Sequence, residues 1–556
     1  MSPIRRRTKF IFSVIPISTL LFLYLLTSTT KAISVQTVHL QNLHHHHQLC
    51  EGTTYTDLCF STLTSHPNLT SKPLPQIISS VVRTTIAAVD NSASNCTTLR
   101  HTLRRLDPRS KMALDDCLEL LEEAAEDLSA ALGDLKARAE AADDLQTLLS
   151  AAMTNAYTCL DGFYNCNDTE VWSAIDGGLK HVHELISTSL AMVQKMKVPP
   201  PAAASEGEAA FEEYGRVHMG FPGWVSRKDR KVLLEAAKGT VRADLVVAKD
   251  GTGNFTKVAE AVAAVPDNRR RRFVIYIKEG TYFENVEVNK TKTNVMFVGD
   301  GIGKTVIKAN RNAVDGWTTF RSATVAVVGN GFLARDLTIE NYAGPSKQQA
   351  VALRVGSDRS AFYMCAIVGY QDTLYVHSLR QFYRQCNVFG TVDFIFGDAS
   401  VVFQDCNLFA RRPNPKQHNI FTAQGRADKN QNSGISIQNC RVTASSDLVP
   451  VKSRFKTYLG RPWKEYSRTM YMQSRIDDLV DPAGWVKWEG DFALKTLYYR
   501  EYMNLGAGAD TSKRVTWPGF RVTRNETEAA QFTVREFIQG EEWLNETSIP
   551  YRGGLS

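Results

Sequence analysis

The stretch Ala361–Phe409, AFYMCAIVGYQDTLYVHSLRQFYRQCNVFGTVDFIFGDASVVFQDCNLF, repeats itself. Cys365, Cys386 and Cys406 occupy equivalent positions in the repeat, at spacings of 21 and 20 residues. Short runs of Phe, Tyr, Val and Ile return with the same period, and Gly or Asn stands at the corners. This period is typical of a right-handed parallel β-helix, in which each coil buries its apolar face only by stacking on the next. The stretch therefore predicts an all-β right-handed parallel β-helix.

Residues in one column of such a coil are direct neighbours, because stacked strands lie ~4.8 Å apart. Cysteines at that separation can meet the Cα distance of a disulfide, roughly 4.4 to 6.8 Å. A bridge between Cys386 and Cys406 is therefore favoured. Cys406 with Cys440 is the competing pairing.

The same column argument brings two carboxylates together. Asp372 lies seven residues after Cys365, and Asp393 lies seven residues after Cys386. Two like charges this close do not both ionise easily, so the pKa of one rises and the pair can work as an acid beside a base. Asp393 also stands in the apolar run Thr-Val-Asp-Phe-Ile-Phe, where an unpaired carboxylate would be costly. We interpret the pair as catalytic rather than as two solvated turn residues.

The N-terminus indicates entry into the secretory pathway. The basic segment Arg5–Lys9 precedes the apolar segment Phe10–Leu26, an order typical of a signal peptide, although the apolar run approaches the length of a membrane anchor. We expect residues 1–32 to be one or the other. Ten cysteines suit an oxidising compartment. The sequons for N-glycosylation are Asn68, Asn95, Asn167, Asn254, Asn289, Asn525 and Asn545.

Residues 45–197 have a helical pattern. Apolar residues recur at steps of three or four along Leu114, Leu118, Leu121, Ala125, Leu128, Leu132 and Leu135. This spacing marks one face of a long amphipathic helix, and several such helices predict an all-α four-helix bundle. Cys50 with Cys59 can staple an N-terminal hairpin, whereas Cys117 with Cys159 would tie two helices together. His181 and His183 are interpreted as exposed helix positions.

Residues 198–241 are predicted to be a linker. The run from Val198 is rich in proline and alanine without an apolar period, which is typical of a semi-rigid spacer. The basic cluster Arg227–Lys231 follows, and an exposed basic join between domains is open to a processing protease. Residues 242–556 form the predicted β-helix domain. No metal or cofactor is expected, because the run His44–His47 has no carboxylate or cysteine at ligand spacing.

Five segments, in order, are similar to the signature segments of plant pectin methylesterases. They are Gly280–Glu284, Gln349–Arg354, Gly369–Tyr375, Gly390–Gly397 and Leu459–Trp463. Residues 45–197 resemble the pectin methylesterase inhibitor family through Cys50, Cys59, Cys117 and the stretch Tyr157–Phe163. The resemblance implies a secreted, two-domain enzyme of the plant cell wall with an inhibitor-like pro-region. Its reaction would hydrolyse the methyl esters of homogalacturonan (pectin) to pectate and methanol.

The resemblance also implies a role for each site residue. Asp393 matches the nucleophile and Asp372 the proton donor, while Gln349 and Gln371 match the amide groups that stabilise the oxyanion. Substrate contacts are implied for Thr319, Gln349, Arg461 and Trp463, with Arg461 beside the nucleophile and Trp463 as a wall for a sugar ring.

The net charge indicates the kind of partner, and two other functions are weighed against the esterase. The formal charge of +7 fits a polyanionic partner, and no basic helix or known module indicates nucleic acid. A pectin depolymerase of the inverting type needs carboxylates ~6.5 to 9.5 Å apart, wider than adjacent coils provide. A catalytically silent β-helix protein that acts through its inhibitor-like domain is the other alternative, and the intact set of site residues argues against it. Separate inhibitor proteins are candidate partners.

Overall fold

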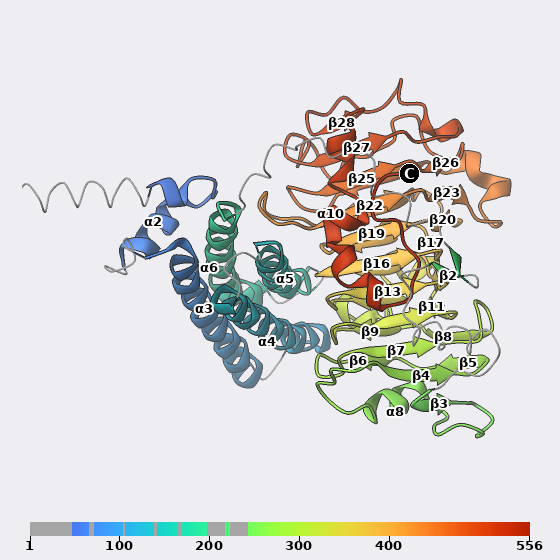
Figure 1. Cartoon of the computed structure of the whole chain (residues 1–556), viewed down its shortest axis with the longest axis horizontal. Coiled ribbons are helices and arrows are strands. Elements are labelled where there is room, and N and C mark those ends of the chain that lie inside the picture. The colour runs from blue at the N-terminus through green and yellow to red at the C-terminus, as the bar shows by residue number, and fades with distance from the viewer. Residues whose placement is uncertain are drawn as a thin grey trace, which may run out of the picture.

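The computed structural model consists of a helical part packed against a stack of β-coils (Figure 1). It describes residues 47–65, 72–103, 106–137, 142–164, 166, 169–196, 217–218, 221–222 and 243–556. Residues 1–32, the Arg227–Lys231 cluster and the sequons Asn68 and Asn167 lie outside the described residues. The sequons at Asn95, Asn254, Asn289, Asn525 and Asn545 lie at exposed positions.

Three parallel sheets form the coils. The 11-stranded sheet stacks β3 (Leu245–Val247), β4 (Phe273–Ile277), β7 (Val295–Val298), β10 (Leu333–Arg335), β13 (Ser360–Tyr363), β16 (Arg380–Arg384), β19 (Ser400–Gln404), β22 (Gly434–Gln438), β25 (Arg468–Met472), β27 (Tyr498–Tyr502) and β28 (Phe520–Val522). The 8-stranded sheet stacks β5 (Gly280–Phe283), β8 (Thr305–Ala309), β11 (Thr338–Asn341), β14 (Ala366–Val368), β17 (Asn387–Gly390), β20 (Asn407–Ala410), β23 (Arg441–Ala444) and β26 (Arg475–Ile476). The 7-stranded sheet stacks β6 (Val286–Val288), β9 (Val325–Val327), β12 (Leu353–Val355), β15 (Leu374–Val376), β18 (Ile395–Gly397), β21 (Asn419–Gln424) and β24 (Thr457–Pro462). The predicted parallel β-helix is confirmed.

The interior of the coils is held by side chains stacked in register. Phe362 pairs with Tyr383, which pairs with Phe403 on the next coil. Their rings stack at centroid distances of 4.8 and 4.7 Å, which is the spacing of the strands, and all three are fully buried. Apolar residues at equal positions in successive coils thus build a continuous core from Val247 to Phe520.

The cysteines lie in one interior column, but the favoured bridge between Cys386 and Cys406 is wrong: both are thiols, as are Cys365 and Cys440. The backbone N–H of Cys386 donates to Sγ of Cys406, and that of Cys406 to Sγ of Cys440, each at 3.4 Å. In a parallel, in-register ladder the Cα–Cβ bonds point the same way. A disulfide needs a suitable direction of the two Cα–Cβ bonds as well as a short distance, so two cysteines in one column are not bridged merely because they are close.

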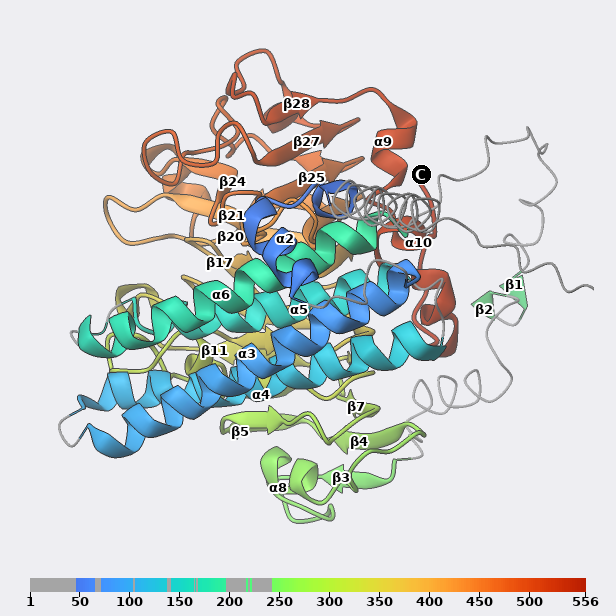
Figure 2. The same cartoon turned by 90° about the vertical axis from the view of Figure 1, so that its left-hand side faces the viewer.

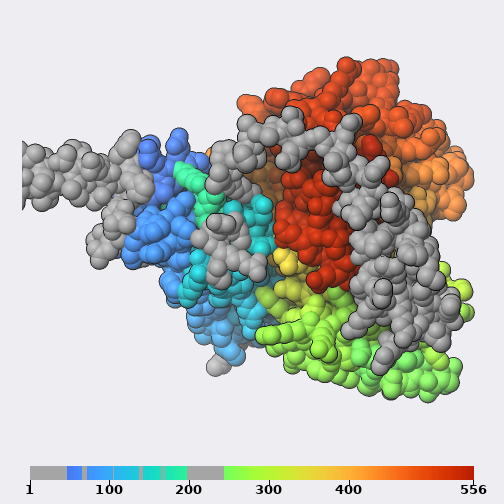
Figure 3. All heavy atoms as spheres, in the orientation of Figure 1, coloured from blue at the N-terminus to red at the C-terminus, as the bar shows by residue number. Residues whose placement is uncertain are grey.

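Short helices cover one end and one side of the coils. α8 (Val258–Ala263) packs on the first coils, where the Glu284 carboxylate accepts hydrogen bonds from the N–H groups of Val258 and Ala259 at 2.8 and 2.9 Å. α9 (Glu526–Ala530) and α10 (Val534–Ile538) cover the outer face of the 11-stranded sheet, where Phe532 and Phe537 pack on Phe382 and Met470. The red C-terminal segment in Figure 3 lies over this face. The 3-10 helices are Phe320–Ser322, Pro345–Lys347, Val449–Arg454, Ala507–Ala509, Gly540–Glu542 and Leu544–Glu546.

The helical part is a four-helix bundle, as predicted. After the short α2 (Thr56–Thr64), the long helices α3 (Leu74–Thr102), α4 (Pro108–Ala137), α5 (Ala142–Asp161) and α6 (Thr169–Gln194) pack together. In Figure 2 they lie in front of the coils. In the sequence that joins the two parts, β1 (Val217–His218) pairs antiparallel with β2 (Phe221–Pro222). None of the helices among the described residues has the length and apolarity to cross a membrane.

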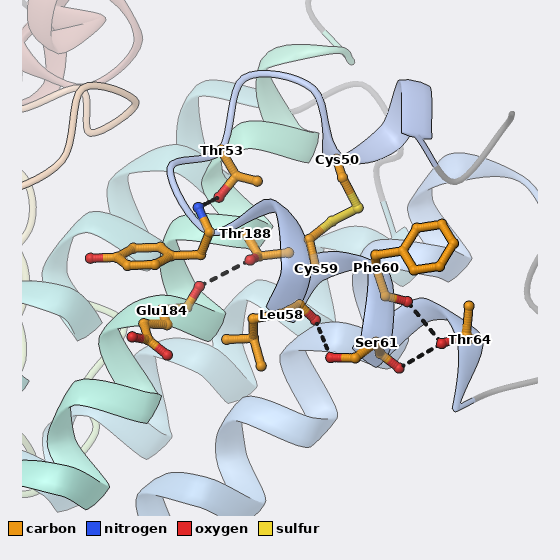
Figure 4. The surroundings of a disulfide bond; sticks show 10 residues. Cys50, Thr53, Leu58, Cys59, Phe60, Ser61, Thr64, Glu184 and Thr188 are labelled. Atoms are coloured by element: carbon orange, nitrogen blue, oxygen red, sulfur yellow. Dashed lines mark hydrogen bonds between the residues drawn. A yellow bond between two sulfur atoms is a disulfide. The ribbon is translucent and has the colours of Figure 1, made fainter. Parts of the chain in front are cut away.

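Both disulfides predicted for the bundle are present. Cys50–Cys59 closes the turn before α2 (Figure 4), and Cys117–Cys159 ties α4 to α5. The interpretation of His183 as exposed is wrong. Its ring is buried and stacks on Tyr157 at a centroid distance of 3.7 Å, and burial lowers the pKa of His183 to about 3. The α6 face that carries it packs inside the bundle, which a two-residue pattern of His181 and His183 does not reveal.

The stacked interior predicts a strong difference between two phenylalanines. Phe403→Ala removes a fully buried ring from the aromatic stack and should lower the free energy of unfolding by about 3 to 5 kcal/mol, since the neighbouring coils cannot close the cavity. Phe283→Ala is the matched control, because this ring is 65% exposed. Urea denaturation of both variants beside the parent chain measures the effect. Equal midpoints for the two variants would contradict it.

Candidate active site

Asp372 and Asp393 lie side by side on successive coils, as the repeat predicts. Leu374 of β15 pairs with Ile395 of β18, and each aspartate stands two residues before its strand residue. Both aspartates have left-handed backbone, with φ of 59° and 48°. This conformation is costly for residues other than glycine, although aspartate tolerates it better than most, and such positions are concentrated at functional sites. Both side chains are at least nine-tenths buried.

Two glycines make room for the second aspartate. A Cβ on Gly390 would lie 2.1 Å from Cβ of Phe394, and a Cβ on Gly397 would lie 2.0 Å from the carbonyl oxygen of Val376. Gly397 also has φ of 129°. The segment Gly390–Gly397 can therefore fold against its neighbouring coil only with glycine at both ends, and this close approach holds Asp393 in place.

Arg461, on β24, binds Asp393 with two hydrogen bonds. Its Nε donates to Oδ1 at 2.8 Å and its Nη2 donates to Oδ2. Such a bidentate pair fixes the plane of the carboxylate as well as balancing its charge. Arg461 reaches this position because Ala423 of β21 pairs both with Phe396 of β18 and with Arg461 itself.

Asp372 has no such partner, and its electrostatic surroundings differ from those of Asp393. Burial raises the pKa of Asp372 well above its ordinary value, the negative charge of Asp393 raises it further, and Arg461 opposes the rise. The pair thus combines a carboxyl group that holds its proton more tightly than usual with a carboxylate bound by a guanidinium. A proton donor beside a fixed carboxylate is an arrangement suited to acyl transfer.

A cavity of about 270 Å³ opens over the two aspartates. All the predicted site residues line it: Thr319, Gln349, Gln371, Asp372, Asp393, Arg461 and Trp463. The Oε1 atom of Gln349 is buried and has no hydrogen-bond partner among the described residues, so this amide oxygen is not committed to the protein. The structure therefore brings together in one cavity the residues that lie far apart in the sequence.

An aromatic wall also borders the cavity, and it consists of Trp463, for which the resemblance implies this role, and of Tyr375 and Phe396, for which it implies none. Tyr375 and Phe396 stack at 4.2 Å between ring centroids, and Trp463 meets the ring of Phe396 edge-on at 5.9 Å. Tyr375 and Phe396 stand three residues after Asp372 and Asp393, in the outward column of β15 and β18, so the strand alternation could have indicated them. Trp488, whose ring lies 4.2 Å from the guanidinium of Arg461, follows no strand pattern, and no local signal points to it.

The helical bundle supplies the other side of the cavity, through Arg109, Thr158, Asp161, Gly162 and Tyr164. Oγ1 of Thr158 lies 2.9 Å from Nε2 of His377, and Nζ of Lys464 donates to Oδ1 of Asp161 at 2.7 Å. Phe320, Tyr375, Phe396 and Trp463 pack in one continuous apolar cluster with the core of the bundle. The bundle therefore covers the candidate site, which no pattern in the sequence of the bundle predicts.

Two family models match the chain. "Pectinesterase" matches residues 244–541, and "Plant invertase/pectin methylesterase inhibitor" matches residues 45–192. "Pectinesterase 3" of Citrus sinensis is 50% identical over 519 residues, which are 91% of this chain and 88% of that protein. "Pectinesterase/pectinesterase inhibitor 3" of Arabidopsis thaliana is 49% identical over 91% of this chain and 90% of that protein. The solved structure of a pectin methylesterase from carrot is 60% identical, with a TM-score of 0.56, and covers 57% of this chain and 99% of the carrot chain.

The geometry of the aspartate pair predicts how one carboxyl group responds to the other. Asp393→Asn removes the neighbouring negative charge, so the pKa of Asp372 should fall, while burial keeps it above the ordinary value. Infrared titration of the carboxyl C=O band, compared with the parent chain, measures this shift. Asp477→Asn, far from the pair in the turn after β26, is the control and should leave the band of Asp372 where it was. A pKa of Asp372 that does not change in Asp393→Asn would refute the coupling.

Proposed function

Because the chain belongs to the pectinesterase family and removes methyl esters from pectin, we propose that Asp393 is the nucleophile and Asp372 the proton donor of that reaction. The protein is a carboxylic ester hydrolase that carries an inhibitor-like N-terminal domain. The resemblance seen in its signature segments is thereby confirmed, and the relatives named above lend no support to a depolymerase or a silent binding protein. The observation that carries the assignment is the bidentate contact of Arg461 with Asp393 beside Asp372, a buried carboxyl group whose pKa is raised.

The proposed reaction has two steps. The Asp393 carboxylate attacks the C6 carbonyl carbon of a methylated galacturonate, and the amide groups of Gln349 and Gln371 donate to the oxyanion. Asp372 gives its proton to the departing methoxy group, so methanol leaves and an acyl intermediate remains on Asp393. Water then attacks this intermediate and gives a proton to Asp372, which restores both aspartates and releases the free galacturonate.

The remaining contacts are assigned to substrate binding. Trp463, with Tyr375 and Phe396, offers an aromatic surface on which a sugar ring can pack. Thr319 lines the same cavity and is assigned as a further substrate contact. Arg461 is assigned an indirect part in substrate binding, because it holds Asp393 in position. Trp488, whose ring lies against the guanidinium of Arg461, extends the aromatic surface.

We further propose that residues 45–197 keep the enzyme inactive until they are removed. The bundle covers the aromatic wall and contributes to the cavity above the aspartates, so a polymer cannot enter while the bundle is docked. Cleavage of the linker 198–241 at Arg227–Lys231 by a processing protease would free the catalytic domain 242–556. Residues 1–32, as signal peptide or anchor, would direct the chain through the secretory pathway to the extracellular cell wall.

A direct comparison of two chains tests both proposals. Residues 242–556 should release methanol from highly methylated homogalacturonan without added calcium, and the full-length chain should release little. Asp393→Asn in the short chain should lower the rate by roughly a thousandfold or more, since no nucleophile remains. Circular dichroism shows whether that variant is folded. Chain cleavage instead of methanol release, or normal turnover by Asp393→Asn, would overturn the assignment.

The docking of the bundle should depend on pH. Burial against the coils raises the pKa of Glu123 to about 8 and of Asp127 to about 6. The docked state therefore holds protons on these two carboxyl groups that a freed bundle would lose, so their contribution to docking is lost as the pH rises through 6 and 8. His377, buried against Thr158 of the bundle, has the opposite effect at lower pH, because burial lowers its pKa to about 3. The methanol-release rate of the full-length chain, divided by that of residues 242–556, should therefore increase as the pH rises through 8, above the range in which a freed histidine titrates.

The matched variant for this effect is Glu123→Gln, which keeps the neutral side chain at every pH. It should flatten the upper part of the pH dependence of the full-length chain, whereas Glu122→Gln on the same helix should not. A ratio that falls with rising pH would contradict the sign of the effect.

A further inference from the structure

The turn Gly369–Thr373 leads from β14 to β15 and carries two of the site residues. Gln371 and Asp372 are neighbours in this turn, and both line the catalytic cavity. The left-handed φ of 59° at Asp372 is a conformation that persists only where the surrounding structure holds it. The contacts that hold this turn therefore also set the directions of its two functional side chains.

The backbone of the next coil holds one side of the turn. The N–H of Asp372 donates to the carbonyl oxygen of Val392 at 3.0 Å, and the N–H of Thr391 donates to the carbonyl oxygen of Tyr370 at 2.9 Å. These bonds continue the register of the strands into the corner where the two aspartates lie. The carbonyl oxygen of Gly369, at the start of the turn, is bound by a side chain from further along the stack.

That side chain is Arg411, which directly follows β20, two coils beyond β14. Its Nη1 donates to the carbonyl oxygen of Gly369 at 2.9 Å, and its Nη2 donates to the hydroxyl oxygen of Tyr370 at 2.7 Å. The guanidinium also lies 3.8 Å from the centroid of the Tyr370 ring. Because a guanidinium is planar and carries several donors, it can form hydrogen bonds and stack on an aromatic ring at the same time. Arg411 thus binds both the backbone and a side chain of the turn.

Arg411 is itself held by the coils on either side. Its backbone N–H donates to the carbonyl oxygen of Gly390 at 2.8 Å, and its Nε lies 3.8 Å from Oδ2 of Asp447, which follows β23 on the coil beyond. The carboxylate of Asp447 also accepts from the backbone N–H of Arg412 at 3.4 Å. The side chain of Arg411 is 21% exposed. Its guanidinium therefore connects the corners of several successive coils beside the aspartate pair.

The position of Arg411 does not suit it to bind the reacting ester. Neither Arg411 nor Tyr370 is among the described residues that line the cavity of about 270 Å³. The pKa of Asp372 is raised by burial and by the charge of Asp393 and lowered by Arg461. Contact with the turn, rather than contact with the substrate, is therefore the effect that Arg411 can have on the site.

We propose that Arg411 is a positioning residue of the esterase, which holds the turn Gly369–Thr373 so that the amide group of Gln371 and the carboxyl group of Asp372 stay aligned with an ester bound at Asp393. The proposal rests on the esterase function proposed above. Without Arg411, the turn keeps its backbone bonds to the next coil but loses the contacts at Gly369 and Tyr370. Reacting groups that are misplaced by about 1 Å can lower a rate about a hundredfold.

The test uses residues 242–556, which contain the whole apolar core of the coils. The carrot enzyme is 60% identical and corresponds, over 99% of its own length, to 57% of this chain, so a polypeptide of about this size folds without the bundle. Methanol release from highly methylated homogalacturonan gives kcat and KM for the parent, Arg411→Ala, Arg411→Lys and Tyr370→Phe.

Arg441→Ala is the matched control. Arg441 is an arginine of β23 on the coil after that of Arg411, and it also pairs with an aspartate, because its Nη2 lies 3.0 Å from Oδ2 of Asp477. Its side chain is 56% exposed. Its printed contacts are with Asp477 alone, outside the turn that carries Gln371 and Asp372. This variant should have the kcat and KM of the parent.

Arg411→Ala should lower kcat about 10- to 100-fold and leave KM within about twofold, because the groups that bind the substrate are unchanged. Tyr370→Phe keeps the ring and removes the hydroxyl group, so kcat should fall about fivefold. Arg411→Lys keeps the charge and a donor for the carbonyl oxygen of Gly369, so its kcat should lie between those of the parent and Arg411→Ala.

Two further measurements separate positioning from a general loss of stability. Methylguanidinium, added far below denaturing concentrations, should raise the kcat of Arg411→Ala because it can occupy the vacated place beside Tyr370, whereas methylammonium should not. Hydrogen exchange in a peptide that covers residues 366–376, followed by mass spectrometry, should be faster in Arg411→Ala than in the parent. Arg441→Ala should show neither effect.

Parent values of kcat in Arg411→Ala and Tyr370→Phe would overturn the proposal. A rise in KM alone would also overturn it, because Arg411 would then be a substrate contact. If Arg411→Ala fails to fold by circular dichroism, Arg411→Lys and Tyr370→Phe decide the question by the same measurement. Absence of methanol from the parent would refute the esterase function itself, whereas an active parent with equally active variants would refute only the role of Arg411.

Discussion

Register between successive coils is the constraint on which the rest of this structure depends. Each coil repeats the last at the spacing of paired strands, so whatever stands at one position stands directly over its equivalent. The interior uses this for the stack of Phe362, Tyr383 and Phe403. The outer surface uses it to place Asp372 against Asp393, where burial and the closeness of the second carboxyl group both raise the pKa of Asp372. Stability and chemistry thus have the same geometric origin.

The sequence predicts those parts of the site whose residues are separated by a regular number of residues per coil. Coils of 20 and 21 residues place Asp372 beside Asp393 without any knowledge of the fold's other features. The repeat length does not predict the position of Arg461, because the coils that lead from β18 to β21 and from β21 to β24 contain more residues and differ in length. Only the resemblance to a family connected it with Asp393. The bridge between Cys386 and Cys406 failed for a related reason: a column gives the distance between two side chains but not the directions in which they point.

The sequence does not predict where the bundle lies on the coils. Each helix is explained by its own amphipathic pattern, and the coil of the catalytic part by its period, but neither pattern contains the surface where the two meet. That surface joins an aromatic wall to a row of ion pairs and hydrogen bonds. The aromatic side chains that we assign to substrate binding are covered by the bundle in the intact chain, and the polar contacts around them make this cover sensitive to charge.

The helix α8 and its partner Glu284 lie far from the aspartates, yet Glu284 belongs to the first of the signature segments. A stack of parallel strands has two terminal coils whose unpaired edges could accept a strand from another molecule. At the N-terminal end, α8 lies over the apolar interior, and two hydrogen bonds from its first turn to Glu284 hold it there. Glu284 therefore lies away from the cavity that the other signature segments line, and its consequence is a covered end, which is one way in which a stack of strands avoids pairing with another molecule.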